Sequence, residues 1–238
     1  MKDLLPVREG HVCGTAADNH LFVEAVLYRY RAGIPWRDLP ARFGDWKNVH
    51  RRLRRWCESG VIERIFRHLA SDHDNEYMMI NSTIGRAHQH SAGTRKKRGT
   101  DQAIGRSRRG LTTKIHAVVD ASGKAAILSL TPGQRADITE AEPLLDEVEP
   151  KAFIADKADD ADPFIKKLKE RQITVAIPSR RSRRNPRKIS SQLYKNRNII
   201  ERLSVRLKQF GGVATRYDKL KSTFIAAMQL VSAIIGLN

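Results

Sequence analysis

The stretch YKNRNIIERLSVRLKQF, residues 194–210, says most about how this chain folds. Its polar face is formed by four residues spaced three, four and seven apart: Tyr194, Arg197, Glu201 and Lys208. On an α-helix these positions fall within about 60° of arc. Apolar residues occupy the opposite side: Ile199, Ile200, Leu203, Leu207 and Phe210. The spacing predicts one continuous helix with a core face and a face that presents a single carboxylate among cations. That face suits a metal-binding acid beside a DNA phosphate, but an ordinary surface helix with ion pairs has the same pattern.

The same spacing carries a family resemblance. Tyr, two residues, Arg, three residues, Glu, six residues, Lys surrounds the last catalytic acid in many bacterial insertion-sequence transposases of the DDE type. Further stretches resemble this family, and most closely its group of insertion sequence five: IPWRDLPARFGDWKNVHRRLRRW, INSTIGRAHQHSAG, GRSRRGLTTKIHAVVD, LTPGQRAD, IADKADDAD and RYDKL. The resemblance runs through most of the chain. It implies an enzyme that binds the terminal inverted repeats of its element and catalyses metal-dependent DNA cleavage and strand transfer.

The charge of the chain agrees with a polyanionic partner. Its 238 residues contain 44 Lys and Arg against 26 Asp and Glu, which gives a net charge of +18. The cations are clustered, as RKKR at 95–98 and RRSRRNPRK at 180–188. Each run alone is typical of a solvated loop, but together with a basic helix they favour a surface that follows DNA phosphates.

Other features indicate the compartment. The chain has only two cysteines, Cys13 and Cys57, without metal or redox spacing, which is typical of a reducing cytoplasm. Residues 1–10 have no apolar run of the kind found in signal peptides, and the apolar tail at 224–237 is too short to span a bilayer. We therefore expect a cytoplasmic, nucleoid-associated protein without a membrane partner.

The chain divides into three parts. Residues 1–18 match the family poorly. Residues 19–70 read as helix, turn, short helix, turn and basic helix, which is the layout of a helix-turn-helix DNA-binding domain. A dimerising helical cap that reads no bases is the alternative. Residues 71–238 form the third part, in which basic loops are expected at 95–109 and 179–193.

The sequence pattern of residues 71–238 predicts an α/β fold with a mixed sheet flanked by helices. Strands are expected at 77–84, at 113–120 and 125–130 as a hairpin, at 152–155 and at 173–177. Helices are expected from Asp137, with Glu140 as a capping-box partner, and at 162–171 and 224–237. The resemblance implies the ribonuclease-H-like fold for this order, preceded by the small all-α domain.

In the DDE family, three acids hold two divalent cations. The resemblance carries the second acid onto Asp156 and the third onto Glu201. At the first position, where the family has Asp before Ser-Thr, this chain has Asn81. A carboxylate bridges two metals about 3.5–4 Å apart, whereas an amide offers one neutral oxygen. We therefore expect two Mg²⁺ or Mn²⁺ ions bound weakly by Asp156 and Glu201, with only a weak contribution from Asn81, and severe loss of strand cleavage.

Cations across the chain are expected to contact double-stranded DNA, both element ends and target. They are Arg51, Arg52, Arg54, Arg55, Arg95, Lys96, Lys97, Arg98, Arg108, Arg109, Lys114, Arg180, Arg181, Arg197 and Lys208. Because two DNA ends must be paired, a homodimer or larger assembly on DNA is expected. Two other functions remain open: a non-catalytic DNA-binding remnant that occupies element ends, and a general ribonuclease-H-like nuclease.

Overall fold

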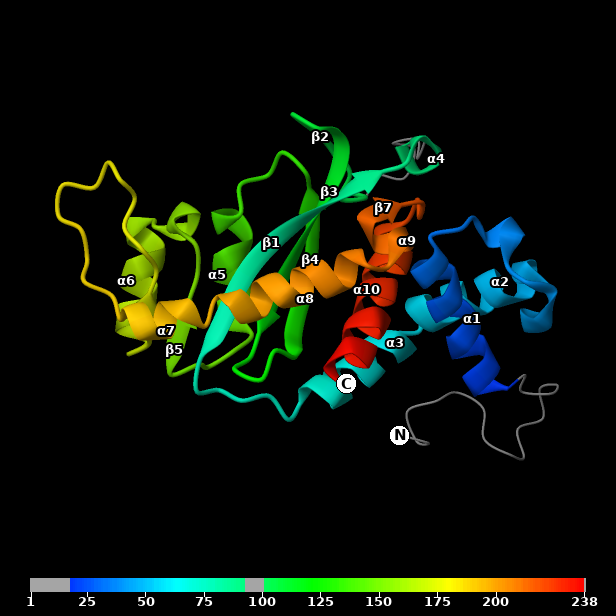
Figure 1. Ribbon diagram of the computed structural model, residues 1–238, viewed down its shortest axis with the longest axis horizontal. Helices are drawn as coiled ribbons and strands as arrows, with labels where there is room; N and C mark the ends of the chain where they lie inside the picture. The colour runs from blue at the N-terminus through cyan, green and yellow to red at the C-terminus, as the bar shows by residue number, and fades with distance from the viewer. Residues whose placement is uncertain (1–17, 93–100, 238) are drawn as a thin grey trace.

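The computed structural model describes residues 18–92 and 101–237, and Figure 1 shows the arrangement of its elements. Three helices open the described chain: α1 (Asn19–Ala32), α2 (Trp46–Glu58) and α3 (Val61–Ala70). Helix α1 ends at Gly33, which adopts φ +66°, a conformation that glycine takes without strain. Two short 3₁₀ turns, Trp36–Asp38 and Ala41–Phe43, lie between α1 and α2. The helical character predicted for 19–70 is confirmed.

A seven-stranded sheet forms the centre of the molecule. Its strands are β1 (Met78–Ala87), β2 (Gly105–Ser107), β3 (Gly110–Val119), β4 (Ala125–Pro132), β5 (Ala152–Ile154), β6 (Thr174–Ala176) and β7 (Thr215–Arg216). The main order is β4-β3-β1-β5-β6, in which β4, β3 and β1 pair antiparallel and β1, β5 and β6 pair parallel. The short β2 pairs with the start of β3, and β7 with the end of β1. The predicted mixed sheet is confirmed, whereas β2 lies in a segment that we expected to be a loop.

Helices cover both faces of this sheet. On one face, α5 (Ile138–Asp146) and α6 (Asp162–Glu170) pack on a core that contains Met78 and Phe153. The opposite core contains the next residue of each strand, Met79 and Ile154, because successive strand side chains point to opposite faces. That core also receives α8 (Asn198–Lys208), α10 (Lys221–Gly236) and the three N-terminal helices. In Figure 1, α8 crosses in front of the strands.

The N-terminal helices share this core with the sheet instead of forming an isolated globule. The Arg29 guanidinium at the end of α1 donates to the Asp218 carboxylate at 3.1 Å, and the Tyr30 hydroxyl donates to the same carboxylate at 2.8 Å. All three groups are buried. A Cβ atom on Gly33 would lie 3.0 Å from the backbone of Gly211 in α9 (Gly211–Ala214), so α1 approaches α9 closely. The boundary near residue 70 therefore divides sequence motifs, while the packing is continuous across it.

The helix predicted over 194–210 is wrong in one respect, because it is broken. Helix α7 covers Ser191–Lys195, and α8 begins at Asn198. Between them, the Asn196 amide bonds to the Leu193 carbonyl at 3.2 Å and the Arg197 amide to the Tyr194 carbonyl at 3.1 Å. Such i→i−3 bonds tighten the chain and end the first helix. The predicted apolar face is confirmed for Ile200, Leu203, Leu207 and Phe210, which are buried, while Ile199 is partly buried.

The elements between and after the strands complete the fold. They are α4 (Gln89–Ala92), a 3₁₀ turn at Lys157–Asp159 and the long helix α10, which was expected at 224–237. Within 18–92 and 101–237, no helix combines the length and the apolar composition that crossing a bilayer would require. The basic run at 95–98 lies outside the described residues.

Candidate active site

Asn81 lies on β1 and Asp156 follows the end of β5, and these two strands are neighbours in the sheet. The parallel pairing of β1 with β5 joins Met78 to Phe153 and Met79 to Ile154. Continued by two residues, this register places Asn81 opposite Asp156, at the interstrand spacing of about 4.8 Å. Both residues follow the alternation of Met79, so both belong to the face that α8 covers.

Glu201 reaches the same place from the first turn of α8. Arg197, the residue before this helix, connects the two acids. One terminal nitrogen of its guanidinium lies 2.8 Å from Glu201 Oε1, and the other lies 3.4 Å from Asp156 Oδ2. The structure thus brings Asp156, Arg197 and Glu201 together by direct contacts, and the extended strand register places Asn81 beside Asp156.

Asn81, Asp156, Arg197 and Glu201 are called the acid group below. Protein donors already engage most of its side-chain oxygens. Asp156 Oδ1 accepts a hydrogen bond of 2.6 Å from the Lys157 amide, and Asn81 Oδ1 accepts one of 2.9 Å from the Ser82 amide. Within the part of the chain that the structure describes, Glu201 Oε2 accepts no hydrogen bond. The carboxylates are accessible, since the Asp156 and Glu201 side chains are 41% and 53% exposed.

This donor set fits one hard cation better than two. The Arg197 guanidinium shows that Asp156 and Glu201 converge closely enough to share a positive group. Hard cations prefer charged oxygen ligands, and Asn81 adds only a neutral one. Among the described residues, no group of three His, Cys, Asp or Glu side chains is placed to hold a metal ion. A pair of metals would lack the carboxylate that bridges them.

The turn after Asp156 is anchored by the basic loop that follows β6. Asp160 is buried and accepts hydrogen bonds from the Arg180 amide and from the Arg183 and Arg187 guanidinium groups. Burial alone would raise the pKa of Asp160, but these hydrogen bonds lower it to about 2. The Arg180 guanidinium also donates to the Ala158 carbonyl at 2.7 Å. Part of the cationic loop is therefore committed to holding the Asp156 turn.

The sequence did not predict that a second acid, Asp159, would be buried with a raised pKa. Its side chain is buried, and a backbone hydrogen bond with Asp156 and the charge of Arg180 offset this burial only in part. Burial, followed by repulsion from Asp137 and Asp156, raises its pKa to about 6. The one signal in the sequence was the pair Ala158-Asp159, which stands where the family usually has Gly-Tyr.

The structure separates the predicted DNA-contacting cations into two groups. On α2, Arg51 and Arg55 are exposed, and Arg54 is exposed while pairing with Glu58 at 3.0 Å. Further exposed cations on other elements are Arg108, Arg109, Arg181 and Lys208. Arg52 differs from its neighbours, because its guanidinium stacks over Phe22 at 4.4 Å and over Trp56 at 5.2 Å and bonds to Asn19. These contacts account for the position of the Arg52 side chain without any role in DNA binding.

Lys114 also has a partner within the protein. Its ammonium group lies 2.8 Å from Asp137 Oδ1 at the start of α5, and its side chain is 15% exposed. Since Asp137 makes no cap hydrogen bond, the predicted capping box is wrong. Its expected partner Glu140 instead accepts from the Ser129 hydroxyl at 2.8 Å. The Asp137 carboxylate binds an ammonium group where a backbone amide was expected.

Two polar residues near the site have structural roles. Asp120 is fully buried and accepts from the Lys124 amide at 2.8 Å and from the Asp74 amide at 3.1 Å, which closes the β3–β4 turn. His116 is buried and its Nε2 lies 2.7 Å from the Thr131 hydroxyl oxygen. Burial lowers the pKa of His116, so the ring stays neutral. Neither residue contacts the acid group.

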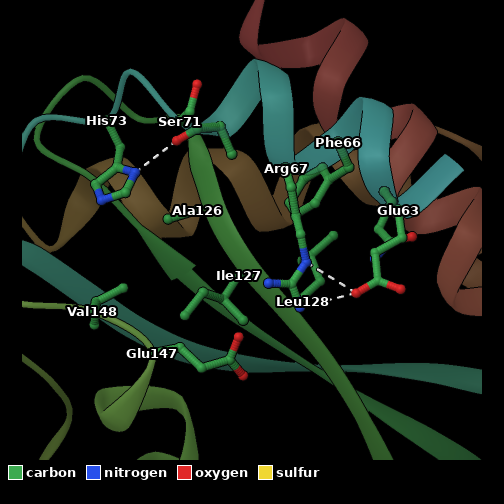
Figure 2. A pocket seen from close by; sticks show the side chains of 12 residues that line it. Glu63, Phe66, Arg67, Ser71, His73, Ala126, Ile127, Leu128, Glu147 and Val148 are labelled. Carbon is green, nitrogen blue, oxygen red and sulfur yellow. Dashed lines mark hydrogen bonds and ion pairs between the residues drawn. The ribbon is translucent and has the colours of Figure 1, made fainter. Parts of the chain in front are cut away.

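A separate pocket of 270 Å³ lies between α3 and β4 (Figure 2). Its polar side chains mainly satisfy one another or the backbone. Arg67 pairs with Glu63 at 2.9 Å, and His73 Nδ1 lies 2.6 Å from the Ala70 carbonyl. The residues that line this pocket include none of the acid group. The acid group remains the better candidate for chemistry.

Comparisons of the sequence with known proteins identify its relatives. Residues 76–235 match the family described as transposase DDE domain, and residues 1–66 match the family described as putative transposase of IS4/5 family. A putative transposase for insertion sequence element IS6501 from Brucella ovis is 35% identical over 132 residues, which cover 54% of this chain and 100% of that protein. An uncharacterized protein, y4sN, from Sinorhizobium fredii is 49% identical over 86 residues, 36% of this chain and 69% of that protein.

The fold is also similar to a solved transposase. A cryo-EM structure of the piggyBac transposase synaptic complex with hairpin DNA superimposes with a TM-score of 0.57 and 11% identity, over 99% of this chain and 69% of that chain. This likeness supports the ribonuclease-H-like sheet predicted from the element order. Because the family model at residues 76–235 covers more than half of the chain, the chain belongs to the DDE transposases, a family of metal-dependent nucleases and strand-transfer enzymes.

Proposed function

We propose that this chain binds the terminal inverted repeats of its insertion sequence and cleaves them with much reduced activity. The convergence of Asn81, Asp156 and Glu201 supports this proposal most directly. Two carboxylates meet there, and the third position carries an amide. The reaction class follows from the family, and the reduced cleavage is expected because Asn81 replaces a metal-binding carboxylate.

The residues at the site have separate tasks in this proposal. Asp156 and Glu201 would hold a divalent cation, Mg²⁺ or Mn²⁺, and Asn81 would add a weak neutral oxygen. When bound, such a cation activates the attacking oxygen and stabilises the leaving oxygen of a phosphodiester. Asp160, held by Arg183 and Arg187, keeps the turn of Asp156 fixed so that its carboxylate faces α8.

DNA would be held mainly by the exposed cations. We propose that α2 enters the major groove, since Arg51 and Arg55 project from it and meet no carboxylate within the described residues. Arg108, Arg109, Arg181 and Lys208 would contact phosphates along the path toward the acids. Pairing of two element ends requires two active sites, so we expect a homodimer or larger assembly on DNA.

A nicking assay tests the catalytic part of this proposal. The substrate is a duplex that carries the terminal repeat found beside the gene, with Mg²⁺ as the cation. We expect Asn81→Asp to raise the nicking rate on the order of 100-fold, which corresponds to about 2.7 kcal/mol. Asn75→Asp is the matched control, because it adds the same charge in the exposed turn before β1. Equal cleavage by the natural chain and Asn81→Asp would contradict the proposed defect.

A non-catalytic occupant of element ends is the second candidate. It is favoured by the state of Asn81, whose amide oxygen is already bound to the Ser82 amide. This function predicts that the natural chain binds an end as tightly as Asn81→Asp does. It also predicts that the natural chain inhibits cleavage by Asn81→Asp in a mixture. Cleavage without preference for element ends would instead indicate a general nuclease.

A further inference from the structure

We propose that Arg197 is a positioning residue which acts as an internal counter-cation, and that DNA must draw it away before Asp156 and Glu201 take up a divalent cation. The inference rests on the proposed function, because it assumes that DNA binds beside these acids. It concerns the order of binding, which the family match does not address. Arg197 would then couple the occupation of the metal site to the presence of DNA.

The contacts of Arg197 support competition with a metal. Its two terminal nitrogens bind one oxygen of Glu201 at 2.8 Å and one oxygen of Asp156 at 3.4 Å. The second oxygen of Asp156 is bound to the Lys157 amide. A cation entering between the acids would therefore compete with a donor at each Asp156 oxygen and would face the positive guanidinium at short range. Both effects lower its affinity.

The surroundings of Arg197 make its departure easy. The two carboxylates are 41% and 53% exposed, and ion pairs of this kind contribute only about 0–1 kcal/mol each. The Arg197 Nε atom is buried and has no hydrogen-bond partner among residues 18–92 and 101–237, which is an unfavourable arrangement for a donor. A phosphate offers two oxygens to the planar guanidinium and satisfies it better.

The position of Arg197 in the chain agrees with such a movement. It lies in the break between α7 and α8, before the first residue of the helix that carries Glu201. Its side chain can therefore turn toward bound DNA while the buried residues of α8 stay packed. Glu201 remains on the helix, so the acids keep their positions when the guanidinium leaves.

Binding of Mn²⁺, followed by electron paramagnetic resonance, tests the inference without any turnover. In the absence of DNA, we expect Arg197→Gln to bind Mn²⁺ at least about tenfold more tightly than the natural chain. A mixed-sequence duplex at low salt should raise the Mn²⁺ affinity of the natural chain by a similar factor and leave that of Arg197→Gln unchanged. By linkage, Mn²⁺ should raise the DNA affinity of the natural chain equally.

Arg206→Gln is the matched control, because it removes the same charge from an exposed position on the same helix, away from the acids. Its Mn²⁺ affinity should stay within about twofold of the natural chain. Arg197→Lys, which keeps the charge but lacks the planar fork, should lie between the natural chain and Arg197→Gln. Equal or weaker Mn²⁺ binding by Arg197→Gln in the absence of DNA, including no binding at all, would overturn the inference. If the chain does not bind DNA, the proposed function and the DNA-dependent half of this inference both fail, while the DNA-free comparison still decides whether Arg197 competes with the cation.

Discussion

Replacing Asp159 with asparagine should stabilise the protein at neutral pH. Asp159 is 6% exposed, and only a backbone hydrogen bond with Asp156 and the charge of Arg180 partly offset the cost of burying its carboxylate. It also faces the negative charges of Asp137 and Asp156. The ionised form is therefore disfavoured in the folded state, while it is fully hydrated in the unfolded chain. An amide of the same shape removes the charge and leaves the turn after β5 intact.

The size of the effect follows from the pKa of Asp159. Burial and its two acidic neighbours raise this pKa from 3.8 to about 6. At about 1.36 kcal/mol for each unit, ionisation costs the folded state about 3 kcal/mol. The penalty is absent below about pH 3.8, grows as the pH rises toward 6 and is complete above it. We expect Asp159→Asn to recover only about 2 kcal/mol of this at pH 7.5, because a neutral amide accepts the Asp156 hydrogen bond more weakly and adds a buried NH₂ donor.

Urea unfolding at several pH values measures this difference. The stability advantage of Asp159→Asn should be near zero or negative at pH 4 and should rise between pH 4 and pH 7. Asp146→Asn serves as the control, since that carboxylate is 56% exposed and its removal should change stability by the same small amount at every pH. An advantage of Asp159→Asn that does not change with pH, or a loss of stability at pH 7.5, would refute the reasoning.

Three further predictions concern other parts of the molecule. Asp160→Asn should lower the free energy of unfolding by about 3–5 kcal/mol, because it leaves buried arginine contacts without their charge, and limited trypsin digestion should then cut first within 180–188. Arg52→Ala should lower stability by about 1–2 kcal/mol in urea titrations and hardly change DNA affinity, whereas Arg55→Ala should reduce the salt dependence of DNA binding by about one unit of slope and leave stability unchanged. Gly33→Ala should cost about 1–3 kcal/mol in a thermal melt, since its φ is +66° and the added Cβ would lie 3.0 Å from Gly211.

The sheet was predictable because its signals are local. The alternation in 113–120 and the turn before Ala125 predict a hairpin, and short apolar runs at 77–84, 152–155 and 173–177 predict the parallel strands. β2 escaped prediction because its three residues are held only by the hairpin with β3. The break between α7 and α8 escaped because the apolar spacing continues through it, and periodicity does not report where backbone hydrogen bonds change.

The candidate site was only partly predictable. The family motif named Asn81, Asp156 and Glu201, and the observed register places Asn81 beside Asp156. The motif did not say that Arg197 would bridge the two acids, because that depends on the crossing of α8 over the sheet. The sequence also did not show that Lys114 pairs with Asp137 within the protein, whereas other cations remain exposed.

The buried contact between Arg29 and Asp218 joins the first described helix to the segment before the last one. Residues 189 positions apart in the chain therefore unfold together. A recombinant fragment that begins after α3 would uncover the apolar side of α10 and leave the Asp218 carboxylate without Arg29 and Tyr30. The three N-terminal helices are consequently a poor module for transplantation into another protein, and, under the proposed function, changes of DNA specificity should be made by exchanging surface residues of α2 alone.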